Sequence, residues 1–135
     1  MEKTQQPKGL NIALWVVQII LGLLYLIAGA SKTFQPVEEL GKSLPWVLTT
    51  PLALVRFIGL SELAGALGLL LPSLLRIRPL LTVYAAIGLT LVQVFAAIFH
   101  VSQGDSNVLG INLVFLLLSG FVAWGRFKKV PIVAK

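Results

Sequence analysis

The strongest constraint on the fold is an apolar run of about 20 residues that nevertheless contains charged side chains. The run, Leu52 to Pro72, is long enough to cross a hydrocarbon core of roughly 30 Å. Arg56 and Glu62 lie inside it. A charge at membrane depth costs about 3 kcal/mol, so such side chains usually face a protein interior or a wet cavity. Small residues recur along the run and allow neighbouring helices to approach closely. The run therefore predicts the inner, packed helix of a membrane bundle.

Three further apolar runs have a similar length, and they indicate an all-α fold. We expect a single domain over residues 1–135, built as a four-transmembrane-helix bundle with helices at about 10–31, 52–71, 80–100 and 108–124. Pro72 and Ser73 are expected to end the second helix. The composition agrees, because only 12% of the residues are charged and 57% are hydrophobic, whereas a soluble domain usually has about a quarter charged residues.

The segment between the first two helices is punctuated by Pro36, Pro45 and Pro51. Residues 37–42 are too few to span a membrane, and we expect a turn or two of helix there, lying at the interface. Trp46 is interpreted as an interfacial anchor.

The basic residues predict the orientation of the bundle. The first loop carries Lys32 and Lys42, whereas the two tails and the second loop carry most of the other basic residues. We expect the basic tail to act as a topology determinant. The positive-inside bias therefore predicts a multi-pass protein with both termini in the cytoplasm. The basic residues assigned to the cytoplasmic side are Lys3, Lys8, Arg76, Arg78, Arg126, Lys128, Lys129 and Lys135.

Polar side chains recur at a spacing of seven within the apolar runs, which places them on one face of each helix. Gln18, Tyr25 and Lys32 form such a stripe, and Gln93 and His100, like Asn112 and Ser119, repeat the spacing. With the predicted topology these groups come to overlapping depths and form one polar chamber that opens outward. The candidate residues of this ligand or proton pocket are Lys32, Arg56, Glu62, Gln93, His100, Asn112 and Tyr25.

Arg56 and Glu62 do not pair along their own helix, because six residues separate them by about 120°. Glu62 is expected to find a partner on another helix, and the candidates are Lys32, His100 and Gln93. Arg56 needs backbone carbonyls, Asn112 or a ligand. Charge swaps at Glu62 and Lys32, made singly and together, test the first pairing.

Each of these signals has a structural interpretation beside the functional one. Glu62 with a basic partner is a buried ion pair that fixes helix register, an interpretation we favour over catalysis. Lys32 near a helix end commonly reaches the headgroups, and His100 at a helix end meets interfacial water rather than relaying protons. Gln93 and Asn112 are more often interhelical hydrogen-bond formers than ligands. No catalytic residue can be named from the sequence.

Several kinds of chemistry are excluded by residue content. The chain has no cysteine and one histidine, which rules out disulfides, thiolate metal sites and a multi-histidine metal site within one chain. We expect no metal. The basic charge is scattered at the ends of apolar runs, which fits anionic headgroups rather than nucleic acid.

The combined pattern resembles the DoxX-like family of small four-helix membrane proteins. The pattern consists of G-x-x-K at Gly29 and Lys32, a run R-x-x-G-x-x-E-x-x-G-x-x-G from Arg56 to Gly68, His100 and an Asn in the last helix. The resemblance spans Leu10 to Arg126. It implies a four-helix bundle in a bacterial cytoplasmic membrane. Some relatives are subunits of quinone-linked oxidoreductases such as thiosulfate:quinone oxidoreductase, and an animal relative is a chaperone for receptor assembly.

Three functions follow as hypotheses. The first is the membrane subunit of a quinone-linked oxidoreductase, with a quinone or similar amphiphile as cofactor in the outer pocket. Its electrons would come from a redox partner or a bound organic cofactor, since the chain has no thiol, flavin or metal motif. The alternative is a non-enzymatic scaffold or assembly factor that binds another membrane protein, with a structural polar cluster. A lipid or small-solute carrier, which would need a homo-oligomer to form a pore, ranks last.

Overall fold

Five α-helices and two short helical turns make up the computed structural model of the chain, which describes residues 7–104 and 109–134. The four long helices are α1 (Lys8–Phe34), α3 (Leu52–Leu75), α4 (Leu80–Ser102) and α5 (Leu109–Trp124). All four, with α5 extended to Lys129, are long and apolar enough to cross a membrane. The all-α four-span bundle predicted from the sequence is confirmed. Lys3, Lys135 and the predicted start of the last helix at Val108 lie outside the described residues.

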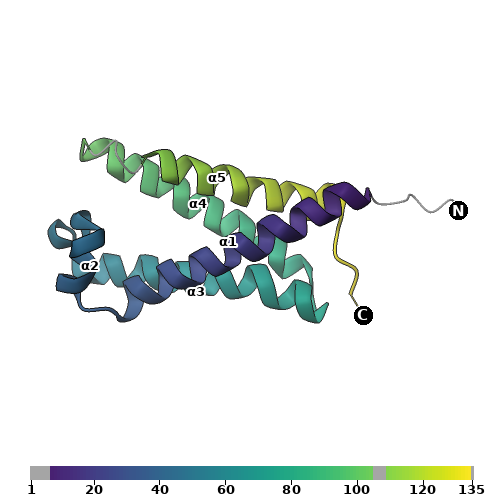
Figure 1. Cartoon of the computed structure of the whole chain (residues 1–135), viewed down its shortest axis with the longest axis horizontal. Helices are drawn as coiled ribbons and strands as arrows, with labels where there is room; N and C mark the ends of the chain where they lie inside the picture. The colour runs from purple at the N-terminus through teal and green to yellow at the C-terminus, as the bar shows by residue number, and fades with distance from the viewer. Residues whose placement is uncertain (1–6, 105–108, 135) are drawn as a thin grey trace, which may run out of the picture.

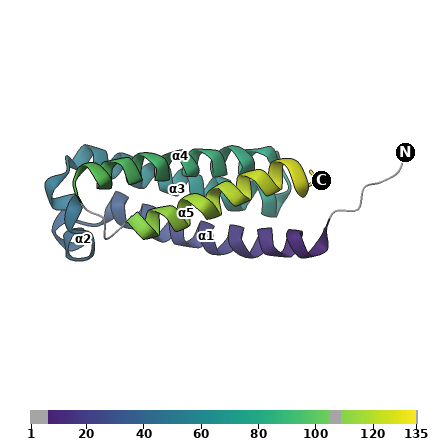
Figure 2. The ribbon, with the colours of Figure 1, turned by 90° about the horizontal axis from the view of Figure 1, so that it is seen from above.

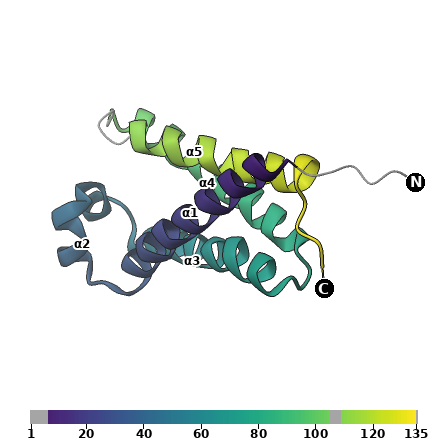
Figure 3. The same cartoon turned by 45° about the vertical axis from the view of Figure 1, so that its right-hand side comes forward.

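The long helices associate as two pairs. Helix α1 packs on α3, α4 packs on α5, and α3 also contacts α4. Figures 1 and 3 show the two pairs further apart at the end that carries α2 (Val37–Ser43) than at the other end. We call these the α2 end and the termini end, because the start of α1 and the segment after Lys129 both lie opposite α2 (Figures 1 and 2).

The proline-rich connection after α1 folds over the α2 end. Pro36 and Pro51 directly precede α2 and α3, and Pro45 begins the 3₁₀ turn η1 (Pro45–Thr49), as expected for a residue whose missing N–H costs nothing in a first turn. The short helix expected over residues 37–42 is therefore confirmed as α2. Leu40, Val47 and Val55 pack together and hold this connection onto α3.

Helix α3 does not end at Pro72, contrary to the prediction from the sequence. Pro72 lies inside the helix, which continues to Leu75 and is closed by Arg76 in the left-handed conformation with φ 56°. A proline removes one backbone hydrogen bond, a loss that membrane helices tolerate where neighbouring groups compensate. The Ser73 hydroxyl lies 2.7 Å from that of Thr82, which ties this last turn to the start of α4.

The long helices expose a largely apolar surface, and several polar groups are buried inside the bundle. Large apolar side chains such as Ile27, Leu60 and Ile98 are exposed on the long helices, as a lipid-facing surface requires. A small core cluster around Leu21, Tyr25, Leu69 and Leu89 joins the four long helices. The buried polar and charged residues are Gln18, Glu62, Ser73, Thr82, Gln93, His100, Ser119 and Arg126.

Candidate functional site

Helices α1 and α3 cross closely at Gly29 and Gly59, next to the candidate site residues Lys32 and Glu62. A Cβ atom on Gly29 would lie 2.6 Å from the backbone nitrogen of Leu63, and one on Gly59 would lie 2.7 Å from that of Thr33. Both distances are too short for real atoms, so only glycine permits this approach of the two backbones. The predicted packing role of the small residues on α3 is confirmed at this position. Lys32 and Glu62 each follow one of these glycines by three residues, which brings them to the same crossing.

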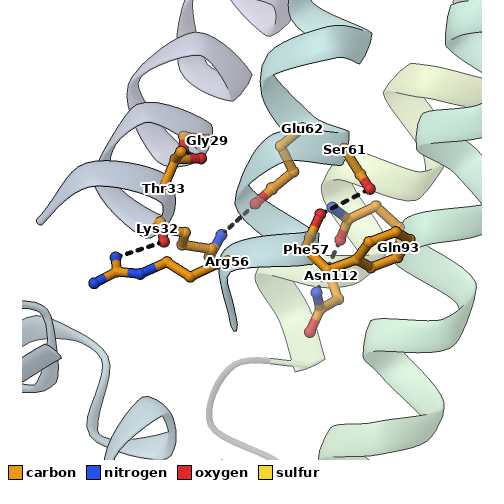
Figure 4. A network of polar contacts seen from close by, with 9 residues as sticks. All are labelled: Gly29, Lys32, Thr33, Arg56, Phe57, Ser61, Glu62, Gln93 and Asn112. Carbon is orange, nitrogen blue, oxygen red and sulfur yellow. Dashed lines mark hydrogen bonds and ion pairs between the residues drawn. The ribbon is translucent and has the colours of Figure 1, made fainter. Parts of the chain in front are cut away.

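Lys32 and Glu62 form an ion pair at the crossing. The Lys32 Nζ donates to Glu62 Oε1 at 2.6 Å, and the two side chains are 12% and 5% exposed (Figure 4). Of the three partners considered for Glu62, the structure selects Lys32. The expectation that Lys32 reaches the headgroups is wrong, because its ammonium group turns inward to the carboxylate. An isolated charge would be costly at this depth, and the pairing offsets that cost.

Arg56 closes the end of α1 instead of lining the chamber. Its Nη1 donates to the carbonyl oxygens of Lys32 and Gln35 at 2.9 and 2.7 Å. Figure 4 shows the guanidinium beside Lys32. The last carbonyls of a helix lack partners within it, so a cation placed there satisfies them and interacts favourably with the helix dipole. Of the alternatives for Arg56, backbone carbonyls are the partners found. Arg56 therefore fixes the backbone that carries Lys32.

A second polar chain crosses from α5 to α4 and α1. Asn112 Nδ2 donates to Gln93 Oε1 at 2.8 Å (Figure 4). The Gln93 side chain is also a neighbour of the Tyr25 hydroxyl, which lies 3.1 Å from the hydroxyl of Ser119. These contacts confirm the expected interhelical bonding of the two amides. The Asn112 Oδ1 atom is buried and accepts no hydrogen bond from the residues that the structure describes.

Between these two polar groups lies a cavity of about 480 Å³ at the α2 end of the bundle. This volume is within the usual range for small-molecule sites, which are mostly apolar with a few placed polar groups. The cavity is bounded by five of the seven candidate residues, whereas Arg56 and Tyr25 lie outside its lining. The five are Lys32, Glu62, Gln93, His100 and Asn112.

Aromatic rings form the wall of the cavity next to the connection between α1 and α3. Trp46, on η1, lies edge-on to His100 with ring centroids 5.5 Å apart and to Phe99 at 5.9 Å. His100 is 5% exposed, so the interpretation that it merely meets interfacial water is wrong. Trp46, the expected interfacial anchor, also lines the cavity. The sequence offered no spacing rule for this contact, because it depends on how the connection folds back over the bundle.

A further polar cluster at the termini end was missed in the sequence. Arg126, assigned to the basic tail, is buried in the π-helical turn η3 (Gly125–Lys129). Its Nε donates to Gln18 Oε1 at 3.0 Å, and its Nη1 donates to Asn11 Oδ1 at 2.8 Å. The guanidinium also lies 5.0 Å from the ring centroid of Trp15. The seven-residue spacing was the available signal, because it extends from Ser119 to Arg126 and from Gln18 back to Asn11.

The geometry can hold an amphiphile with a polar ring or headgroup. One wall supplies a charged donor and a carboxylate, the opposite wall supplies an amide, and most of the remaining lining is apolar or aromatic. Among the described residues, no three His, Cys, Asp or Glu side chains come together as a metal site would require.

Comparison with known proteins gives one match. The family model described as the DoxX-like family matches residues 16–122. This range contains the crossing, the ion pair and the whole cavity lining. None of the curated proteins and none of the solved structures compared with the chain matches it.

Proposed function

The chain belongs to the DoxX-like family, and from this premise we propose that it is the membrane subunit of a quinone-linked oxidoreductase. Its four apolar helices make it an integral, multi-pass membrane protein. In this proposal the cavity at the α2 end binds a quinone or a similar ring-bearing amphiphile. A redox partner in the membrane supplies or accepts the electrons.

The observation that carries the proposal is the composition of the cavity wall. Phe57, Phe95, Phe99 and Phe115 give it an aromatic and apolar lining, which suits a flat hydrophobic ring. The polar lining consists of the Lys32–Glu62 pair, the Gln93–Asn112 pair, His100 and two hydroxyl residues, Thr50 and Ser61. A quinone needs this combination, because its ring is apolar and its two oxygens need hydrogen-bond partners.

Each polar group has a role in the proposal. Lys32 donates to a ligand oxygen, and Glu62 holds Lys32 in place and can accept a proton. His100, beside Trp46, exchanges protons with the ligand. Arg56 acts indirectly as a positioning residue, because it holds the carbonyl of Lys32.

The proposed setting is the cytoplasmic membrane with both termini in the cytoplasm. Lys8, Arg76, Lys128 and Lys129 lie towards the termini end, at or directly after the ends of the spanning segments. The positive-inside rule favours the cytoplasm for such an end. The cavity then opens in the outer half of the bilayer.

A ligand-dependent stability measurement tests the proposal. Thermal unfolding of the purified full-length protein in detergent is followed with and without a decyl-substituted benzoquinone. We expect a concentration-dependent rise in Tm, because a ligand that binds only the folded state stabilises it. Native mass spectrometry of gently extracted protein provides an independent readout, a co-purifying quinone.

Ala96 lines the cavity, whereas Ala53 is exposed on α3. Ala96→Leu fills part of the cavity and is expected to abolish the rise in Tm. Ala53→Leu adds the same atoms outside the cavity and should leave the rise intact. An unchanged Tm for the parent protein at saturating quinone, with no co-purifying quinone, would contradict the proposal.

One observation favours the alternative of a scaffold or assembly factor. A groove between α3 and α4 is lined by small residues, including Ala64, Gly65, Gly68 and Gly88. Grooves of this kind accept helices of other membrane proteins. Crosslinking followed by pull-down distinguishes the two functions. A stable membrane partner that is retained by Glu62→Gln, in a protein that binds no quinone, would favour the scaffold.

A further inference from the structure

The starting point is the orientation of the Asn112 amide in the cavity. Its Nδ2 atom is used by Gln93, so the oxygen points away from that contact (Figure 4). An amide oxygen can only accept hydrogen bonds. Among the described residues nothing donates to this buried oxygen, although Asn112 lines the cavity.

The contact with Gln93 sets the orientation of the Asn112 amide. Gln93 is 4% exposed, and its oxygen accepts from Asn112 Nδ2 at 2.8 Å. Turning the Asn112 amide over by itself would place its oxygen against the oxygen of Gln93. The Gln93 contact therefore opposes such a flip, because an amide is assigned by its partners.

The opposite wall offers both a donor and an acceptor. Glu62 is held by Lys32 through one carboxylate oxygen, an ionised carboxylate only accepts, and the Lys32 ammonium group can donate further hydrogen bonds. A ligand that bridges the two walls therefore meets an amide oxygen on one side and the Lys32–Glu62 pair on the other.

These contacts discriminate between the two redox forms of a quinone. A quinone carbonyl only accepts hydrogen bonds, so against Asn112 Oδ1 it would leave two acceptors facing each other. A quinol hydroxyl donates, and it satisfies the buried oxygen. We propose that the cavity selects the quinol form over the quinone form through a hydrogen bond from a ligand hydroxyl to Asn112 Oδ1. This inference rests on the proposed function and specifies which form of the ligand the site prefers.

The expected preference is about tenfold in Kd, because a buried acceptor left unpaired weakens binding by roughly that factor. The preference has a thermodynamic consequence for the bound couple. Tenfold tighter binding of the reduced form of a two-electron couple raises its midpoint potential by about 30 mV. The site would then favour reduction of the quinone that it holds.

The test compares three probes on the full-length protein in detergent, under anaerobic conditions. They are a decyl-substituted benzoquinone, the corresponding quinol, and the dimethyl ether of that quinol, which has the same ring but no hydroxyl donor. Competition binding gives the three Kd values. For the parent protein we expect the quinol to bind about tenfold more tightly than either of the others.

Two variants locate the effect. Asn112→Leu keeps a similar size but removes the acceptor, and it should reduce the ratio of quinone Kd to quinol Kd to about one, with quinone binding retained. Ser61→Ala is the matched control, because Ser61 lines the cavity but its hydroxyl already donates to the Phe57 carbonyl at 2.9 Å. This control should keep the tenfold ratio.

The outcomes separate this inference from the proposed function. Equal binding of quinone and quinol, tighter binding of the quinone, or ether binding as tight as quinol binding would each overturn the inference and leave the function standing. Loss of the preference in Ser61→Ala but not in Asn112→Leu would also overturn it. Binding of none of the three probes would remove the proposed function together with the inference. The ether comparison needs no variant, so it decides the question even if Asn112→Leu fails to fold.

Discussion

Lys32 and Glu62 show how two ionisable residues can reside in an apolar helix pair. Each side chain is nearly buried, and each is the other's partner at 2.6 Å. Removing one member of a buried pair leaves an unpaired charge, which typically costs 3–5 kcal/mol, whereas apolar replacement of both is often neutral. The effects of replacing Lys32 and Glu62 on the free energy of unfolding are therefore strongly non-additive.

A double-mutant cycle tests this coupling. Lys32→Met and Glu62→Gln are each expected to lower the free energy of unfolding by about 3–5 kcal/mol. The double variant should lose much less than the sum of the two. Denaturant unfolding in detergent, followed by tryptophan fluorescence, measures the four proteins. Additive losses would show that the two residues act independently.

Arg126 presents a different case, a buried cation without a carboxylate. The ion pairs of the described residues are Lys32–Glu62 and Lys42–Glu39, and the neighbours of Arg126 are amide and backbone oxygens. The planar guanidinium reaches Gln18, Asn11 and the Val130 carbonyl at once. A lysine has a single compact ammonium group and cannot reproduce the planar arrangement of donors that reaches these three acceptors.

Arg126→Lys is therefore expected to destabilise the protein by about 1–3 kcal/mol, although the charge is kept. Lys128 is exposed two residues further on, and Lys128→Gln serves as the control. Its effect should stay within about 0.5 kcal/mol. Urea unfolding monitored by fluorescence distinguishes the two. Equal effects of both substitutions would mean that the buried contacts of Arg126 contribute nothing.

At the scale of the helix, the crossing at Gly29 and Gly59 sets the register of α1 on α3. Gly59→Ala inserts a methyl group where backbone atoms already lie within 2.7 Å. We expect a loss of about 1–3 kcal/mol, since the helices must separate to accept it. The control is Gly88→Ala, because a Cβ there meets nothing within 4 Å.

Gly88→Ala should be neutral or stabilise the protein by up to about 1 kcal/mol, as alanine is the better helix former. Thermal unfolding of both variants in the same detergent provides the comparison. If Gly59→Ala were as stable as Gly88→Ala, the close approach of the two backbones would not be required.

Much of the helical architecture could be predicted because it depends on local pattern. Run length identified the spans, and the seven-residue spacing identified their inward faces, including Gln18, Tyr25 and Gln93. The end of α3 was predicted incorrectly, since a proline interrupts one hydrogen bond but contacts such as Ser73 to Thr82 decide whether the helix continues. The same spacing, applied to the last helix beyond Ser119, would have identified Arg126.

The site itself was predictable only as a set of residues. Helical depth brought Lys32, Glu62, Gln93 and His100 to one region, but several partners remained possible for Glu62. Which partner Glu62 pairs with depends on the distance between α1 and α3, and the glycines at the crossing make that distance short. The role of Trp46 depends on the path of the connection over the α2 end, and no periodicity encodes such a path.

At the scale of the whole molecule, the two ends of the bundle differ in charge. Glu38, Glu39 and Glu62, the acidic residues of the described chain, belong to the α2 end or the cavity, whereas η3 at the other end is basic. We expect both termini in the cytoplasm. The chain has no cysteine, so single cysteines report topology without background.

Lys42→Cys and Lys128→Cys place thiols at exposed positions on α2 and η3. In intact cells an impermeant maleimide should label the first, and it should label the second only after permeabilisation. Labelling in the reverse order would invert the predicted orientation and place the cavity in the inner leaflet.

The crossing of α1 and α3 has a mechanical consequence. Backbone atoms touch where Gly29 meets Gly59, so we expect relative motion of α1 and α3 to be smallest there. The start of α1 lies about 30 Å away by the helical rise, and hydrogen bonds from Arg126 to Asn11 and Gln18 hold it separately. Lys32 and Glu62 lie one turn from the glycine contact. We therefore expect the geometry of the charged pair to change little when the surrounding bilayer deforms.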